Sequence, residues 1–313
     1  MENSTKKIVI PVDGSINSLR SLEYLNLIYS PQQNLTVNLL YVLPTLPRIL
    51  TAEQKDDKEI TSQIKNVEKK NIIMAERILA KAKTSLIEKG FEEENVRTVC
   101  HKMEVTIPRD ICHWARSIEA DAILLGRQGR TDLKTLFIGE VCDKLVERCE
   151  GTPLWIVGGR VESKKVLVCI DASQNAIRAA EHAGSMLSGT DCRVTIFHTI
   201  RHLRRFVPIA LLEKSEKLTH LWKEQSGQQV ATYVEKAKDI LLNAGIPEEQ
   251  ISTKVAEGTR SAANDILSEA LSNGYGTVIM GRRGASMVKE FILGSVSKKV
   301  LLPLSDLAIW IVH

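Results

Sequence analysis

The chain has 313 residues, 43% of them hydrophobic and 26% charged, and its 42 basic and 38 acidic side chains nearly balance. This composition is ordinary for a globular protein and gives no electrostatic argument for binding nucleic acid. No apolar run approaches the length that spans a bilayer, and residues 1–7 lack the apolar segment of a signal peptide, so we expect a cytoplasmic protein without a membrane partner.

The first half alternates short apolar runs with helical patterns. The segment from Lys6 to Asp13 contains a continuous apolar run at 8–12, as in strands of parallel sheets. Leucines at 19, 22 and 25 then recur at helical spacing. In chain order the patterns predict strands at 6–13, 35–43, 95–102, 121–125 and 154–157, and helices at 16–29, 52–89, 107–118 and 141–149.

The second half repeats this order. The patterns predict strands at 164–171, 193–200, 251–257, 277–280 and 307–312, and helices at 176–187, 210–244, 261–271 and 295–302. Alternation of this kind favours an α/β fold with two tandem Rossmann-like domains, each a five-stranded parallel sheet with helices on both faces. We expect the domains to cover residues 1–159 and 160–313.

A glycine motif follows the strand at 277–280. Gly281, Gly284 and Gly294 have the spacing Gly-x2-Gly-x9-Gly, and Ser295 comes next, where a helix is predicted to begin. Glycine lets the backbone turn sharply and approach a ligand closely. The free N–H groups of a helix start attract an anion, above all a phosphate, and the Ser295 hydroxyl could either cap the helix or bind a phosphate oxygen.

The same spacing occurs in the first half. Gly126, Gly129 and Gly139 match it, but Glu140 follows where the second half has a serine. The two copies are offset by a constant amount, since 281 − 126 and 294 − 139 are both 155, and Trp155 and Trp310 keep this offset. The chain is therefore predicted to be an internal duplication.

An aspartate closes the first strand of each half, at Asp13 and Asp171. Ligands of open α/β sheets lie beyond the carboxyl ends of the strands, at the switch point of the strand order. Asp171 and Gly281 both meet that condition, so we expect them to face one ligand.

The glycine-serine pattern after the fourth strand, with the aspartate after the first, resembles the universal stress protein family, twice along the chain. The resemblance implies a stress-response or regulatory protein of the ATP-binding branch, with ATP, ADP or AMP as ligand, with or without Mg²⁺. In the second half it implies nucleotide-binding positions at Ile170, Asp171, Thr199, Met280, Gly281, Arg283, Gly284, Gly294, Ser295, Val296 and Ser297. In the first half it implies weaker equivalents at Asp13, Val42, Gly126, Gly129 and Gly139.

Two positions depart from the family pattern. Glu140 would place a carboxylate beside phosphate oxygens, which it repels. Thr199 stands where the family has an apolar residue against adenine, whereas Val42 keeps that character in the first half. We therefore expect ATP mainly in the second domain.

The resemblance also implies that the fifth strands, 154–157 and 307–312, pair antiparallel within one chain. Association into a homodimer and an unidentified protein partner stay open. No catalytic set and no Gly-x4-Gly-Lys-[Ser/Thr] motif is present, which favours binding over catalysis. The alternatives are a protein-interaction scaffold without nucleotide, and a slow ATPase or an autophosphorylating protein with Ser295 or a nearby serine as acceptor.

Two further sequence features, a pair of histidines and the six cysteines, predict neither a metal site nor a disulfide framework. His198 and His202 have the spacing of metal ligands on a helix, but no nearby cysteine or carboxylate completes a shell, so no metal site is expected. The six cysteines contain no Cys-x2-Cys pair and are expected to be reduced thiols of a cytoplasmic protein: 100, 112, 142, 149, 169 and 192.

Overall fold

The computed structural model of the chain describes residues 5–30, 34–47, 58–127, 139–200, 207, 216–257, 259, 261–284, 293–303 and 306–313. Contacts between Cα atoms divide the chain into two compact units that meet in sequence between Thr152 and Pro153. The short segment Leu27–Tyr29 belongs to the second unit. The predicted domain boundary between residues 159 and 160 follows the sequence repeat and stays a prediction. The contacts between Cα atoms instead place the fifth strand of the first repeat in the second unit.

The first unit contains a parallel sheet with strand order β3-β2-β1-β4. Its elements are β1 (Lys6–Pro11), α1 (Ile16–Ile28), β2 (Leu35–Leu43), α3 (Lys58–Ile87), β3 (Val96–Lys102), α4 (Ile107–Ser117), β4 (Ala122–Gly126) and α5 (Glu140–Arg148). A central β1 with β2 and β4 on either side is the topology that creates a switch point.

The second unit contains a sheet with strand order β5-β10-β9-β6-β7-β8. Its elements are β5 (Leu154–Val157), β6 (Lys165–Cys169), α6 (Gln174–Leu187), β7 (Arg193–Ile200), α8 (Glu216–Asn243), β8 (Ile251–Glu257), α9 (Ala262–Ser272), β9 (Thr277–Gly281), α10 (Ser295–Leu301) and β10 (Ala308–Val312). All neighbours are parallel except β5 and β10, which are antiparallel. The predicted α/β fold is confirmed.

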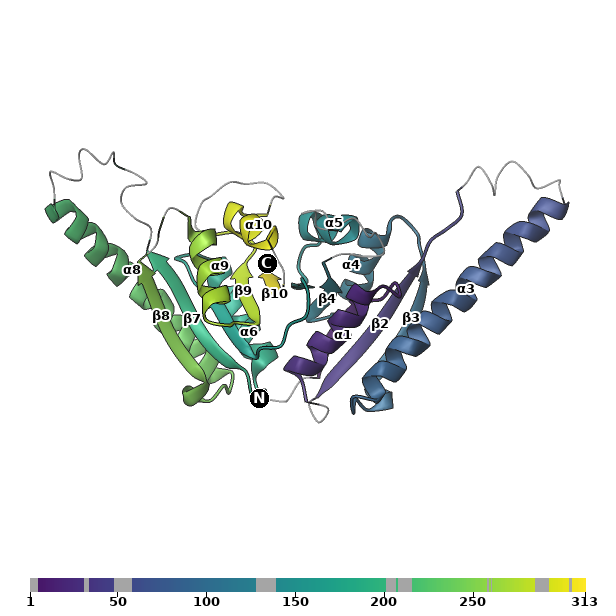
Figure 1. Cartoon of the computed structure of the whole chain (residues 1–313), viewed down its shortest axis with the longest axis horizontal. Helices are drawn as coiled ribbons and strands as arrows, with labels where there is room; N and C mark the ends of the chain where they lie inside the picture. Colours follow the sequence, from purple (N-terminus) through teal and green to yellow (C-terminus); the bar gives the residue numbers. More distant parts are fainter. Residues whose placement is uncertain are drawn as a thin grey trace. The chain divides into compact units, whose positions relative to one another are not determined.

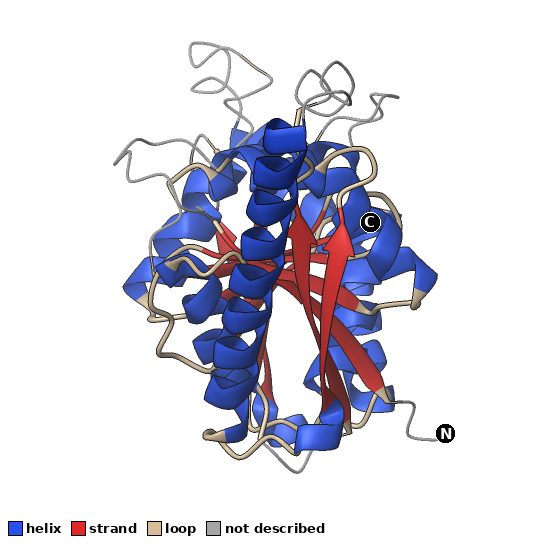
Figure 2. Cartoon of the chain, turned by 90° about the vertical axis from the view of Figure 1, so that its right-hand side faces the viewer, coloured by secondary structure: helices blue, strands red, loops and turns tan. Residues whose placement is uncertain are grey.

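The central strands are buried on both faces. Val166, Leu167 and Val168 in β6 have no exposed surface, and neither do Val278 and Ile279 in β9. Such continuous apolar runs need a layer of helices on each side. In the second unit α6 packs against α8, and α9 packs against α10. Figures 1 and 2 show strands between helices, and Figure 1 shows α8 lying along β7 and β8.

The pairing of the two fifth strands is confirmed. Trp155 in β5 lies directly opposite Trp310 in β10, and their rings stack with centroids 3.7 Å apart. Both tryptophans are fully buried. Two copies of one strand that pair antiparallel bring equivalent residues together, which explains why the repeat-related tryptophans meet.

Cys112 in α4 and Cys149, just after α5, form a disulfide with Cα atoms 5.7 Å apart. Arg116, one turn after Cys112, also donates hydrogen bonds of 2.9 and 2.6 Å to the carbonyl of Glu150. The expectation of six reduced thiols is wrong for this pair, because α4 packs against α5 and joins cysteines 37 residues apart. The other four cysteines are free thiols, and the cytoplasmic location stays a prediction.

The part of the chain that the structure describes contains no helix that is both long enough and apolar enough to cross a membrane.

Candidate functional site

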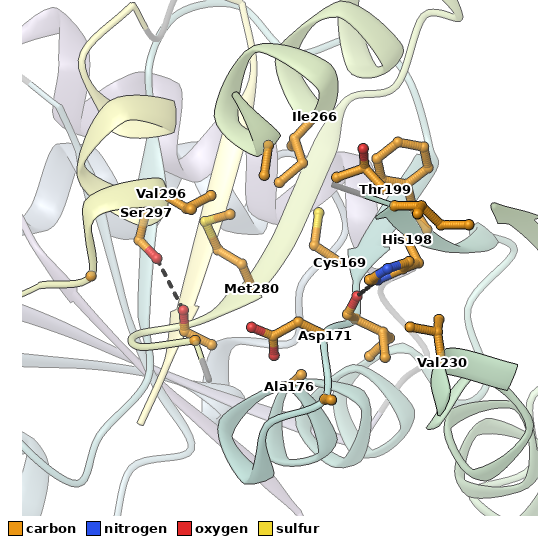
Figure 3. A pocket seen from close by; sticks show the side chains of 18 of the residues that line it. Cys169, Asp171, Ala176, His198, Thr199, Val230, Ile266, Met280, Val296 and Ser297 are labelled. Carbon is orange, nitrogen blue, oxygen red and sulfur yellow. Dashed lines mark hydrogen bonds between the residues drawn. The ribbon is translucent and has the colours of Figure 1, made fainter. Parts of the chain in front are cut away.

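A cavity of about 410 Å³ opens at the carboxyl ends of β6, β7 and β9 in the second unit (Figure 3). A volume of several hundred cubic ångströms is typical of small-molecule sites. All eleven second-half residues predicted from the sequence line it: Ile170, Asp171, Thr199, Met280, Gly281, Arg283, Gly284, Gly294, Ser295, Val296 and Ser297. The fold thus brings together residues that lie up to 127 positions apart (297 − 170).

Asp171 occupies the centre of this cavity. It lies two residues after the end of β6, and the Ser173 hydroxyl donates a hydrogen bond to its Oδ1. A Cβ added at Gly284 would lie 2.5 Å from its Oδ2, closer than any real contact. Because Gly284 has no Cβ, the loop backbone can approach the carboxylate without displacing it. A carboxylate held in this way can accept hydrogen bonds from ligand hydroxyls.

The loop after β9 is tied to the fold at both ends. A Cβ at Gly281 would lie 2.8 Å from the backbone carbon of Asn175, so β9 can end here only in glycine. The Asn175 side chain donates to the carbonyl of Arg283 at 3.2 Å. At the far end, the N–H of Gly294 donates to the carbonyl of Arg282 at 2.9 Å. These contacts position Arg283 and Gly284 at the cavity.

The start of α10 differs from one expectation. Gly294 is the N-cap residue and Ser295 is the first helical residue, so Ser295 does not cap the helix. Instead, the buried Ser297 hydroxyl donates to the carbonyl of Gly281 at 3.0 Å and joins α10 to the end of β9. Ser295 is exposed and lines the cavity, so its hydroxyl is available to a ligand.

The opposite end of the cavity is formed by the end of β7. The Thr199 hydroxyl donates to Oδ2 of Asp265 at 2.9 Å, so this departure from the family pattern adds no unsatisfied polar group to the wall. The Nδ1 of His198 lies 2.7 Å from the carbonyl oxygen of Ile170. Because a carbonyl can only accept, Nδ1 carries the proton of this hydrogen bond.

The floor between these ends is largely apolar. Cys169, Phe197, Ile266 and Met280 all line the cavity, and Figure 3 shows Cys169 between Met280 and His198. Burial, with a smaller effect from the Asp171 carboxylate, raises the pKa of the Cys169 thiol. The thiol therefore stays protonated at neutral pH and behaves as a small apolar group.

One wall of the cavity was missed by sequence reasoning. Trp222, Ser226, Gln229 and Val230 of α8 all line it. Their spacing of four, three and one residues puts them on one face of a helix, but that spacing does not say which strands the helix covers. His198 of β7 also lines the cavity and was not among the predicted site residues.

The first-half residues repeat the framework. A Cβ at Gly126 would lie 2.6 Å from the carbonyl oxygen of Asn17, and the N–H of Gly139 donates to the carbonyl of Arg127 at 2.8 Å. Asp13 accepts a hydrogen bond from the N–H of Ser15, and Val42 is buried at the end of β2. Gly129 lies outside the described residues.

Glu140 begins α5 at the position equivalent to Ser295. Its exposed carboxylate pairs with Lys144 one turn later. The hydrogen bond from Lys144, and then its charge, lower the pKa of Glu140, so the carboxylate stays ionised. The negative charge expected at Glu140 is therefore present, but its carboxylate is paired with Lys144 on the same helix.

Among the described residues, no group of three or more histidine, cysteine, aspartate or glutamate side chains could hold a metal ion. His198 uses Nδ1 for a backbone carbonyl, and His202 lies outside the described residues.

Comparison with known proteins identifies the fold and the family. The model of the Universal stress protein family matches twice, over residues 4–158 and 162–304. The chain is 28% identical to "Universal stress protein YxiE" of Bacillus subtilis over 138 residues, which cover 44% of this chain and 90% of that protein. It is 29% identical to "Universal stress protein MJ0531" of Methanocaldococcus jannaschii over 138 residues, 44% of this chain and 75% of that protein.

One solved structure is similar to the chain over nearly its whole length. The crystal structure of a universal stress protein from Archaeoglobus fulgidus superposes with a TM-score of 0.63 at 18% identity, covering 99% of both chains. At this identity the likeness shows the fold alone, whereas the family is shown by the two matched segments. The chain therefore belongs to the universal stress protein family and carries its domain twice.

Proposed function

We propose that this chain is a regulatory protein of the stress response that binds an adenine nucleotide, mainly ATP, in the cavity of its second unit. The observation that carries the proposal is that all eleven motif residues surround one cavity of suitable size. The nucleotide would change the affinity of the protein for a partner, which the sequence does not identify.

The loop after β9 and the start of α10 suit the phosphates. Gly281, Gly284 and Gly294 line the cavity with backbone atoms, and Arg283 adds a positive charge. The first N–H groups of a helix lack partners within the helix and point outward. Ser295 offers a hydroxyl beside them. Mg²⁺ bound to the phosphates would add positive charge at this end.

The centre of the cavity suits a ribose. The Asp171 carboxylate accepts hydrogen bonds, and a ribose offers two hydroxyls to donate them, as carboxylates in other nucleotide-binding α/β folds accept them. The apolar floor beyond it, with Phe197 and Ile266, suits the flat face of a base.

The first unit is less suited to an anion. At the position equivalent to Arg283 it has Gln128, and at the position equivalent to Ser295 it has Glu140. These two positions together carry a charge of +1 in the second half and −1 in the first. Near a triphosphate this difference disfavours binding, so we infer one principal nucleotide per chain.

We propose binding as the main activity, with turnover absent or slow. Among the residues that the structure describes, none that lines the cavity is a lysine, and the sequence lacks the Gly-x4-Gly-Lys-[Ser/Thr] motif whose lysine contacts the transferred phosphate in P-loop proteins. The exposed Ser295 hydroxyl is the one observation that favours autophosphorylation. Mass spectrometry after incubation with ATP would detect 80 Da of added phosphate, about the mass of one phosphoryl group, and would separate the two functions.

Isothermal titration with ATP tests the proposal. We expect one site per chain in the wild type and no measurable binding in Ser295→Glu, which copies the first-half residue. Glu140→Ser is the matched control, because it makes the reverse change in the other unit and should leave the second-unit site intact. Equal binding by Ser295→Glu and wild type would refute the assignment, and no binding by the wild type would favour the scaffold.

A further inference from the structure

The family motif accounts for one end of the cavity and leaves the other end unexplained. Figure 3 shows Val296 and Ser297 of the motif at one end, Asp171 in the middle, and Val230 with His198 at the other end. If phosphates lie at the motif, the base points toward α8. Resting on the proposed function, we propose that Trp222 of α8 stacks on the base and selects nucleotides over bare polyphosphates.

The geometry of α8 supports this assignment. Trp222 and Val230 are eight residues apart on one helix face, which places the indole about 12 Å further along the helix. Val230 is buried near the sheet, whereas Trp222 is half-buried, so the wall runs from the floor of the cavity to its mouth. Between them, Ser226 and Gln229 offer polar groups that can bond to the edge of a base.

The wall differs between the two halves. With the offset of 155 residues, the positions equivalent to Trp222 and Gln229 are Val67 and Met74 in α3. Both are aliphatic or thioether side chains and are more than a third exposed, at 43% and 38%. At this helix position the half whose motif is intact therefore has an aromatic ring and the other half has an aliphatic side chain, which is expected if the ring serves the same ligand.

Aromatic stacking gives a measurable energy. A planar indole gains affinity from any base and none from inorganic tripolyphosphate, which has no π-face. The contribution of Trp222 is therefore the part of the difference in affinity between ATP and tripolyphosphate that is lost in Trp222→Ala. The motif residues contribute to both ligands.

The experiment is a titration of full-length protein with ATP and with tripolyphosphate. We expect Trp222→Ala to weaken ATP binding by about five- to 150-fold, the range for loss of one base–aromatic stack, and to leave tripolyphosphate binding unchanged. Trp222→Phe should keep most of the preference for ATP. Leu221→Ala is the matched control, because Leu221 is 47% exposed on the same helix and does not line the cavity.

Fluorescence gives a second readout. Of the other three tryptophans, Trp155 and Trp310 are fully buried in the strand pair, and Trp114 lies in α4 of the first unit. A change in emission on adding ATP should therefore come from Trp222 and disappear in Trp222→Phe. Equal ATP affinity in Trp222→Ala and wild type would overturn the proposal. So would a parallel loss of both ligands, because Trp222 would then only support the helix. Failure of wild type to bind either ligand would instead overturn the nucleotide function, and this inference with it.

Discussion

The Nε1 of Trp155 donates a hydrogen bond of 3.0 Å to Nε2 of His182. The two rings meet edge to face, and His182 makes a similar contact with Trp310. Since Nε2 accepts, the neutral histidine carries its proton on Nδ1. Burial disfavours the charged form and lowers the pKa of His182 to about 3.

Acid should therefore weaken this part of the second unit. The folded-state pKa of about 3 lies below the ordinary value of 6.5, so the unfolded state binds a proton that the folded state does not. The stability is complete above about pH 6.5 and falls by up to about 1.4 kcal/mol per pH unit as the pH drops toward 3. Urea denaturation between pH 4 and pH 7 measures this loss.

The control is His182→Gln, whose side-chain oxygen can still accept from Trp155 but binds no proton. We expect its stability to fall less between pH 7 and pH 4 than that of the wild type. Parallel curves for the two proteins would show that carboxylates, and not His182, cause the loss.

Gly284→Ala should weaken nucleotide binding without unfolding the protein. The new Cβ would lie 2.5 Å from Oδ2 of Asp171, and a carboxylate can rotate away, so the side chain moves and not the backbone. Losing one charge-assisted hydrogen bond to a ribose corresponds to about tenfold or more in affinity. Titration with ATP and a thermal melt measure the two effects separately, and an unchanged affinity contradicts the role of Asp171.

Gly281→Ala should have a different effect. Here the new Cβ would lie 2.8–2.9 Å from backbone atoms of Asn175, which cannot rotate away. We expect the free energy of unfolding to fall by about 1–3 kcal/mol, as for other overpacked sites. Gly227→Ala in α8 is the control, because its Cβ would meet nothing within 4 Å and alanine favours a helix. A melt in which both variants behave alike would contradict the assigned contact.

The Cys112–Cys149 disulfide should stabilise the first unit. It closes a loop of 37 residues, which in the chain-entropy treatment corresponds to about 4 kcal/mol. Mass spectrometry of alkylated, unreduced protein should find four modified cysteines, and reduction should add two more and lower the melting temperature. The double variant Cys112→Ser/Cys149→Ser should melt lower than the oxidised wild type and be insensitive to reductant. Six alkylated cysteines before reduction would refute the pair.

Much of the site could be predicted from the sequence because its residues lie in one loop or directly after one strand. The spacing of Gly281, Gly284 and Gly294 describes a continuous piece of backbone, and Asp171 joins it through strand order alone. The contacts between distant elements could not be predicted in this way. Helical periodicity places Trp222 on a face of α8 but does not say what that face covers.

The two expectations that the structure corrects also depend on contacts between distant elements. Ser295 was expected as a possible cap, but the exact start of α10 makes Gly294 the N-cap and gives the structural hydrogen bond to Ser297. Cys112 and Cys149 were read as separate thiols because only the packing of α4 on α5 joins them. Local patterns predict elements and loops, whereas side-chain partners depend on tertiary packing.

The antiparallel contact between β5 and β10 has a consequence for any attempt to produce the second repeat by itself. A fragment of residues 160–313 would lose β5 and leave the hydrogen-bonding groups of β10, together with the face of Trp310, open to water. Uncovered strands of this kind recruit other chains. Such a fragment should dimerise through β10 or precipitate, whereas one that starts at Pro153 keeps its own protective strand.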